Sequence, residues 1–334
     1  MKEENLNQLI NKIKSKKVPF SAVFEITNRC NLRCLHCYQE SGGEELTEGE
    51  IKSILDDLHQ SGTLKLTLTG GEPTLREDFL EIFSYCHQKG FATTLFTNAT
   101  NLPSEARKWM CKNPPFVVET SLYGASAKVH DSITQVEGSF DLSLHNIKWM
   151  VQKGIRVLVK TVILSLNFRE VPSLDNLCQE LGIEFQPSFR VFPSRHPHRS
   201  PERFRLKAEE IKTYLRRDRN FANKKREKEA SSAGEFICNA GREACCIGAN
   251  GRVYPCVTLH WECGDLKKNS FVEVWNQSPT LKKIRSYKEE DFKVCFGCKW
   301  KVLCNFCPGM GFSEHGNMLI PSKEICKFTK VFGS

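Results

Sequence analysis

The chain has 334 residues, enough for one large domain and a smaller one, and it carries 16 cysteines and a formal net charge of +9. It shows neither a secretory signal nor a run of the roughly 20 apolar residues that a membrane span needs. These features exclude a disulfide-stapled secreted protein, so metal binding or catalysis is the better account of the thiols. We expect a reducing cytoplasm as the location, and neither a membrane nor nucleic acid among the partners.

The first predicted element is an amphipathic helix within residues 1–18, where apolar residues recur at helical spacing. We expect this helix to pack on the body of the protein, with peptide or membrane contact as the alternative. We expect no separate peptide-binding module before it.

Residues 19–220 alternate between strand and helix patterns. Strands are predicted at 23–27, 64–69, 92–97, 116–122, 157–164 and 184–191. Helices are predicted at 47–59, 78–89, 104–111, 141–153, 170–181 and, as a possible sixth, 208–219. Thr47 followed by Glu50 is the signature of a capping box at the start of the first of these helices. The alternation predicts an α/β fold with a parallel sheet and right-handed crossovers.

Three cysteines follow the first predicted strand with the spacing C-x3-C-x2-C, namely Cys30, Cys34 and Cys37. Cysteine thiolates ligate four-iron clusters, and three of them leave one iron open to a small-molecule ligand. The alternative is three buried cysteines that pack as small apolar residues.

The second predicted strand ends in Gly70-Gly71-Glu72. Glycine lets a backbone approach a ligand closely, and the Glu72 carboxylate can accept hydrogen bonds from an ammonium group. Asn98 closes the third strand and Ser121 the fourth, and both also suit ordinary turns.

Together these motifs resemble the radical S-adenosylmethionine (SAM) enzymes. The resemblance implies a partial (β/α)6 barrel of the TIM type, with the chemistry on loops at the carboxyl ends of the strands. It implies that the three cysteines hold a [4Fe–4S] cluster whose open iron takes the amino and carboxylate groups of SAM. It also implies SAM contacts from Gly70, Gly71, Glu72, Asn98, Ser121 and His36, the last beside the adenine; metal ligation or simple exposure is the alternative for His36. The pair His130-Asp131 recurs in the same family, and the sequence assigns it no role.

A basic linker is predicted at 221–234, where lysine and arginine dominate. Its charge serves solvation, or alternatively holds an acidic leader peptide. Residues 235–334 form a cysteine-rich unit that is too small to fold without metal. Its motif cysteines are Cys238, Cys256, Cys295, Cys298, Cys304, Cys307 and Cys326.

This series resembles the SPASM extension of radical SAM enzymes, which carries auxiliary [4Fe–4S] clusters. Carried over by motif, one cluster takes Cys295, Cys298, Cys304 and Cys326. The other takes Cys238, Cys256 and Cys307, with a fourth ligand from Cys245, Cys246 or Cys263, or none. The gap between Cys304 and Cys307 is two residues where the family has three, which leaves the partition open. A zinc ribbon is the alternative.

Six cysteines lie outside these motifs. Cys245, Cys246 and Cys263 are candidates for an extra ligand, for a hydrogen-atom donor to a substrate radical as in some radical SAM epimerases, or for packing. Cys86, Cys111 and Cys178 fall within predicted helices, and we expect silent core residues there.

The resemblance implies an enzyme that cleaves SAM reductively to a 5′-deoxyadenosyl radical, with electrons from a flavodoxin- or ferredoxin-type donor. The leading hypothesis is modification of a ribosomally made precursor peptide (a RiPP) by cross-linking, thioether formation or epimerisation. Sulfatase maturation is disfavoured, because Val257 stands where those enzymes carry an acidic residue. The alternatives are biosynthesis of a porphyrin or quinone cofactor, and a non-catalytic iron–sulfur electron carrier, against which the Gly-Gly-Glu motif argues.

Overall fold

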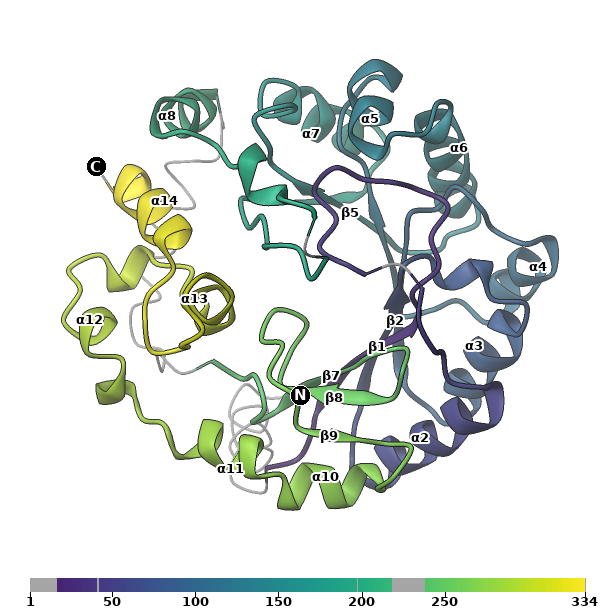
Figure 1. The fold of residues 1–334 in the computed structure, drawn as a ribbon. Helices are drawn as coiled ribbons and strands as arrows, with labels where there is room; N and C mark the ends of the chain where they lie inside the picture. Colours follow the sequence, from purple (N-terminus) through teal and green to yellow (C-terminus); the bar gives the residue numbers. More distant parts are fainter. Residues whose placement is uncertain (1–16, 41, 197, 218–237, 334) are drawn as a thin grey trace, which may run out of the picture.

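The computed structural model describes residues 17–40, 42–196, 198–217 and 238–333 (Figure 1). The predicted N-terminal helix, apart from its last two residues, and the whole basic linker at 221–234 lie outside the described residues. Both therefore stay predictions, as do the domain limits that were drawn from them.

A nine-stranded sheet organises the fold, in the order β6-β5-β4-β3-β2-β1-β7-β8-β9. The first six strands pair in parallel and in chain order. They are β1 (Ser21–Thr27), β2 (Lys65–Gly70), β3 (Ala92–Thr97), β4 (Val117–Ser121), β5 (Val157–Val162) and β6 (Glu184–Ser188). This order confirms the predicted partial (β/α)6 barrel.

The helices that cover the outside of the sheet lie where the sequence predicts them, with one addition (Figure 1). They are α2 (Glu48–Gln60), α3 (Phe79–Gln88), α4 (Ser104–Lys112), α5 (Ala127–Thr134), α6 (Ser139–Gln152), α7 (Val171–Glu180) and α8 (Ala208–Arg217). The capping box at Thr47 is present. Helix α5 was not predicted, although Ser126 caps it and Val129 and Ile133 stand four residues apart.

The cysteine-rich unit continues the barrel sheet, which the sequence did not predict. Strand β7 (Ala244–Ile247) pairs in parallel with β1, and β8 (Arg252–Tyr254) and β9 (Gly264–Asp265) extend the sheet in the antiparallel sense. The four residues of β7 are too few to show an alternating pattern, and two of them are cysteines.

The remaining helices run on from β9 round to the barrel, where α14 lies beside α8 (Figure 1). They are α10 (Phe271–Gln277), α11 (Pro279–Ser286), α12 (Lys293–Phe296), α13 (Pro308–His315) and α14 (Lys323–Gly333). Phe328 and Phe332 of α14 pack with Tyr214 and Leu215 of α8, so the last helix closes the ring on the barrel side.

The main core lies between the strands and the outer helices. Phe24 and Ile26 of β1 pack there with apolar residues of α2 and α3, as does Cys86. Cys178 is buried too, as predicted, whereas Cys111 is exposed and that prediction is wrong. The buried face of α4 is set by Ala106 and Met110, and a residue one position after Met110 turns away from it. Among the described residues, no helix has the length and apolar character needed to cross a bilayer.

Candidate functional site

The cysteine loop leaves the carboxyl end of β1 and is held on one side by the glycines after β2. The N–H of Gly71 donates to the Thr27 carbonyl (2.8 Å) and the N–H of Glu72 to the Arg29 carbonyl (2.7 Å). A Cβ on Gly70 would lie 2.2 Å from the Thr27 carbonyl oxygen, and one on Gly71 would lie 2.2 Å from that of Arg29. Gly70 also has a φ of +144°. The close approach that these glycines allow is therefore to the cysteine loop itself.

The Glu72 side chain is fully buried, and it joins the ends of β2 and β3. Its Oε1 accepts hydrogen bonds from the Thr74 N–H (3.1 Å), the Thr74 hydroxyl (2.7 Å) and the Thr97 hydroxyl (2.7 Å). Its Oε2 accepts the N–H of Asn98 (2.7 Å). Burial raises the pKa of this carboxyl, and the four hydrogen bonds act against that rise. The carboxylate positions the loops that follow β2 and β3, and it does not face open space.

Replacing Glu72 with glutamine is expected to lower the free energy of unfolding by about 1–3 kcal/mol, because an amide NH₂ would meet donors where the carboxylate accepts. Urea unfolding checks the change. Glu105→Gln on the exposed face of α4 is the control and should cost less than about 0.5 kcal/mol. Equal midpoints for the two variants would contradict this role for Glu72.

Helix α5 holds the cysteine loop from the other side. The N–H groups of Arg33 and Leu35 donate to the carbonyls of Thr134 and Ile133 (both 2.9 Å). Asp131 caps the start of α6, where it accepts the N–H groups of Gly138 and Phe140 (2.8 and 2.9 Å). The recurrent His130-Asp131 pair thus belongs to the support of the loop, a role that the sequence did not assign.

The imidazole of His36 lies against Tyr123, with ring centroids 4.5 Å apart, and Tyr123 in turn stacks on His130 at 5.6 Å. Burial lowers the pKa of His36 to about 4 and that of His130 to about 4. Nδ1 of His36 is buried without a hydrogen-bond partner among the described residues. A neutral ring with an unused polar atom beside the cysteine loop suits contact with a bound molecule.

We expect the buried His130 to make the protein measurably less stable in mild acid. Its folded pKa of about 4 lies below the ordinary value near 6.5, so the unfolded chain binds a proton that the folded chain excludes as the pH falls below 6.5. Between pH 7.5 and 5.5 this group should cost the wild type about 1 kcal/mol. His130→Gln should lose less over the same range in urea unfolding. His145→Gln, on the exposed face of α6, should behave as the wild type, and a His130→Gln curve parallel to it would contradict the assignment.

Asn98 and Ser121 lie on the strand ends that flank this loop. The Asn98 amide donates to the Asn31 side chain (2.9 Å) and lies 3.9 Å from the sulfur of Cys30. Ser121, at the end of β4, hydrogen-bonds the side chain of Tyr123. Asn98 is thus tied to the cysteine loop directly, and Ser121 through the rings of Tyr123 and His36.

The three thiols of the loop lie together. Cys30 accepts a hydrogen bond from the N–H of Leu32 (3.4 Å). Burial raises the pKa of Cys30 to about 11, and burial also raises the pKa of Cys34 and Cys37. The charge of Cys37 contributes to the raised pKa of both other thiols, so the sulfurs lie within electrostatic reach of one another. Hydrogen bonds to the sulfurs are among the features that set the reduction potential of an iron–sulfur cluster.

Seven thiols of the C-terminal unit fall into two groups. Burial raises the pKa of Cys256 to about 12, and two nearby thiols raise it further. Burial also raises the pKa of Cys295 to about 11, and three other thiols contribute. The first group is Cys238, Cys256 and Cys307, and the second is Cys295, Cys298, Cys304 and Cys326. The members of each group lie within electrostatic reach of Cys256 or Cys295, and their role as the ligands of two clusters stays a prediction.

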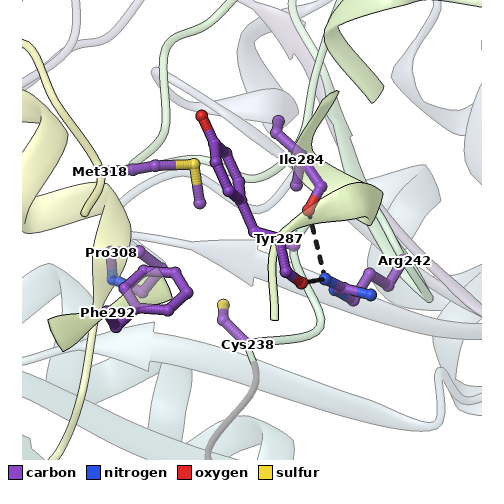
Figure 2. Close-up of a pocket in the computed structure, with 8 residues that line it drawn as sticks. Cys238, Arg242, Ile284, Tyr287, Phe292, Pro308 and Met318 are labelled. Atoms are coloured by element: carbon purple, nitrogen blue, oxygen red, sulfur yellow. Dashed lines mark hydrogen bonds between the residues drawn. The ribbon is translucent and has the colours of Figure 1, made fainter. Parts of the chain in front are cut away.

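Figure 2 shows the Cys238 thiol at a small pocket. Arg242 closes one side, where its Nη2 donates to the carbonyls of Ile284 (3.2 Å) and Tyr287 (2.6 Å). Cys307 directly precedes the lining residue Pro308. The other lining side chains are mostly apolar and include Ile284, Tyr287, Phe292 and Met318. A mostly apolar space beside a thiol suits a cluster that is shielded from water.

The three unassigned cysteines occupy different environments. Cys245 packs with Cys263 in the core between the sheet and the outer helices, and burial raises the pKa of each to about 12. Cys246 follows on β7 and therefore points to the opposite face of the sheet. Burial raises its pKa, and Glu25 and Arg195 are the next charges that act on it. Of the three, Cys246 is the one beside polar groups on the inner face of the barrel.

All sixteen cysteines lie in the described part of the chain, and none forms a disulfide bond. Within residues 17–40, 42–196, 198–217 and 238–333, no three His, Cys, Asp or Glu side chains converge tightly enough to hold a single metal ion. This finding gives no support to the zinc alternative. It does not test the cluster assignment, because a four-iron cube is larger than one ion and spreads its ligands more widely.

Comparison with known families decides the assignment. Residues 24–178 match the family described as the radical SAM superfamily, and residues 238–299 match the SPASM family, described as an iron–sulfur cluster-binding domain. The chain belongs to the radical SAM superfamily. It is an enzyme of the radical SAM–SPASM type, and its cofactors are SAM and [4Fe–4S] clusters.

Relatives of this radical SAM–SPASM enzyme have different substrates by name. It is 26% identical to the AdoMet-dependent heme synthase of Oleidesulfovibrio alaskensis, over 91% of this chain and 86% of the relative. It is 28% identical to the mycofactocin maturase MftC of Mycobacterium tuberculosis, over 84% of this chain and 75% of the relative. Streptococcus suis SuiB, solved with its precursor peptide SuiA, shares the fold with a TM-score of 0.74 at 18% identity, over 97% and 80% of the two chains.

Proposed function

We propose that this radical SAM–SPASM enzyme modifies a ribosomally made precursor peptide. The observation that carries the radical step is the gathering of three thiols at the end of β1, on a loop that Gly71, Glu72 and α5 hold in place. The peptide substrate is supported by the maturase MftC and by AlbA of Bacillus subtilis, a subtilosin bacteriocin biosynthesis protein that is 26% identical over 94% of this chain.

In this proposal Cys30, Cys34 and Cys37 hold the SAM-binding cluster. When bound, that group supplies the electron that cleaves SAM to the radical able to take hydrogen from an unactivated carbon. The side chains of Asn98, Ser121 and His36, with the backbone of Gly70 and Gly71, form the wall that receives SAM. Glu72 holds these residues in place, because its hydrogen bonds join the ends of β2 and β3.

The C-terminal thiols hold the auxiliary clusters in the two sets named above, and the fourth ligand of the first set stays open. Cys246 and Cys263 both lie within electrostatic reach of Cys256. A flavodoxin- or ferredoxin-type protein is the proposed electron donor, and the cytoplasm is the proposed location.

If the product is an epimerised residue, Cys246 is the proposed hydrogen donor among the three cysteines. Its S–H bond would break homolytically, and the hydrogen atom would form the new C–H bond of the substrate. The sulfur left behind would take one electron, supplied by the flavodoxin- or ferredoxin-type donor, and one proton, which restores the thiol. Cys245 and Cys263 lie in the core behind the sheet and cannot reach the inner face without unfolding.

A porphyrin precursor is the second candidate substrate. It is favoured by the heme synthase relative and by an Fe-coproporphyrin III synthase of Methanosarcina barkeri, which is 32% identical over 47% of this chain. In that case the same SAM site would act on the porphyrin.

One experiment separates the two substrates. The anaerobically purified enzyme is incubated with SAM and dithionite, either with the peptide encoded by a neighbouring short reading frame or with iron coproporphyrin III. The proposal expects a change in the peptide and none in the porphyrin. Cross-linking lowers the peptide mass through loss of hydrogen, and epimerisation, which leaves the mass unchanged, is detected as deuterium bound to carbon when the reaction is run in D₂O. A change in the porphyrin alone would replace the peptide proposal by the second candidate.

A further inference from the structure

Arg195, in the segment that follows β6, makes contacts that the sequence did not predict. Its Nη1 donates to Oε2 of Glu25 (3.2 Å) and to Oε1 of Gln39 (2.8 Å). Its Nη2 donates to the carbonyl of Val257 (2.9 Å). The guanidinium also lies over the ring of Tyr38, 5.1 Å from its centroid. One side chain therefore bonds to three segments that are far apart in the sequence.

Two of these segments carry cluster cysteines. Gln39 stands two residues after Cys37, and Val257 directly follows Cys256. The Arg195 backbone adds a further bond, because its N–H donates to the carbonyl of Tyr38 (2.9 Å). The loop of the SAM-binding cluster and the loop of the first auxiliary set are thus tied to one another through Arg195.

The third segment is β1, where Glu25 is 2% exposed on the inner face of the barrel. Gln39 donates from Nε2 to Oε1 of Glu25 (2.5 Å), so both carboxylate oxygens are occupied. The Arg195 side chain is itself only 16% exposed. A buried pair of this kind is costly to break, since removal of one partner leaves an uncompensated charge.

Both charges reach the sulfur of Cys37. Gln39, two residues after Cys37, hydrogen-bonds to both charged groups, and Arg199 is a further cation whose charge acts on Cys37. A fixed cation beside a cluster stabilises the more negative reduced state, and a fixed anion disfavours it. Reduction potentials of iron–sulfur clusters depend on such charges and on hydrogen bonding near the ligands.

We propose that Arg195 is the positioning residue that holds the first auxiliary loop against the SAM-cluster loop and, with Glu25, sets the reduction potential of the SAM-binding cluster. The inference deepens the proposed function, since it rests on the ligand sets given there, and it is independent of the substrate. Its consequence is that Arg195 and Glu25 act on the potential in opposite directions.

The test is a reductive titration of the loaded enzyme, followed by electron paramagnetic resonance (EPR) of the SAM-binding cluster. Arg195→Gln should make the potential more negative, and Glu25→Gln should make it more positive. At a fixed solution potential we expect a change in the reduced-to-oxidised ratio of about tenfold, equal to about 59 mV for one electron. The double variant should return towards the wild type.

Arg205 offers a matched control. Its side chain is 15% exposed, donates twice to the Val191 carbonyl (3.1 and 2.8 Å) and pairs with Glu314 (2.9 Å). Among the described residues, it makes no hydrogen bond or ion pair with either cluster loop. Arg205→Gln should cost similar stability and leave the potential and line shape of the SAM-binding cluster unchanged. Arg195→Lys, which keeps the charge, should retain a potential close to that of the wild type even if Arg195→Gln does not fold.

Shifts of the same sign in Arg195→Gln and Glu25→Gln, or equal effects of Arg195→Gln and Arg205→Gln, would overturn this inference. So would a shifted potential in Arg195→Lys. A wild-type enzyme that takes up no cluster at all would instead refute the proposed function on which the inference rests.

Discussion

Cys34→Ala is expected to lose the SAM-binding cluster and to stop SAM cleavage. Cys34 stands between the other two thiols of the loop, and burial raises its pKa, so deprotonation must be driven by iron. Loss of a residue that hydrogen-bonds to a metal ligand lowers metal affinity or activity by roughly 10- to 100-fold, and loss of a ligand itself should lower them further. The measurements are iron content per chain, which should fall by about four atoms, and 5′-deoxyadenosine detected by mass spectrometry.

Cys178→Ala is the control, because this cysteine is buried in α7, away from the loop. It should keep its iron and its SAM cleavage. The assignment of Cys34 fails if Cys34→Ala retains the iron content and the product of Cys178→Ala.

Gly71→Ala should be nearly as damaging as the loss of a ligand. The added methyl group would lie 2.2 Å from the carbonyl oxygen of Arg29 and 2.9 Å from that of Asn28. Both atoms belong to the backbone that leads into Cys30, so the loop must move. We expect reduced SAM cleavage together with loss of stability of at least about 2 kcal/mol, the order of an overpacked core. Urea unfolding and 5′-deoxyadenosine check these two effects, and the iron content shows whether the cluster is retained.

Gly49→Ala is its control. Gly49 lies in the first turn of α2 with nothing within 4 Å of an added Cβ. The change should be neutral or stabilise the enzyme by about 0.5–1 kcal/mol through helix propensity. Equal activity in Gly71→Ala and Gly49→Ala would show that the contact between Gly71 and the cysteine loop has no importance.

The barrel could be predicted from the sequence because its signals are local. Alternating apolar runs mark each strand, the Thr47 capping box marks α2, and glycines such as Gly154 and Gly182 close helices with a positive φ. The motif at 30–37 and the Gly-Gly-Glu after β2 were found for the same reason: each is a short run of adjacent residues.

The rest depends on contacts between distant segments. No sequence pattern shows that β7 pairs with β1, that α5 holds the cysteine loop, or that Arg195 joins Gln39 to Val257 across 156 and 62 residues. Glu72 was expected to face an ammonium group, and the structure turns its carboxylate to Thr74, Thr97 and Asn98 instead. The burial of polar groups depends on the whole fold, so it cannot be predicted from local sequence motifs.

The central claim is that three thiols at the end of β1 hold a cluster that activates SAM. The most direct measurement is the EPR spectrum of the reduced, anaerobically reconstituted enzyme before and after SAM is added, with 5′-deoxyadenosine measured in the same sample. The account predicts a changed spectrum and accumulation of 5′-deoxyadenosine. A fully loaded enzyme whose spectrum is unaltered by SAM and which forms no 5′-deoxyadenosine would contradict it.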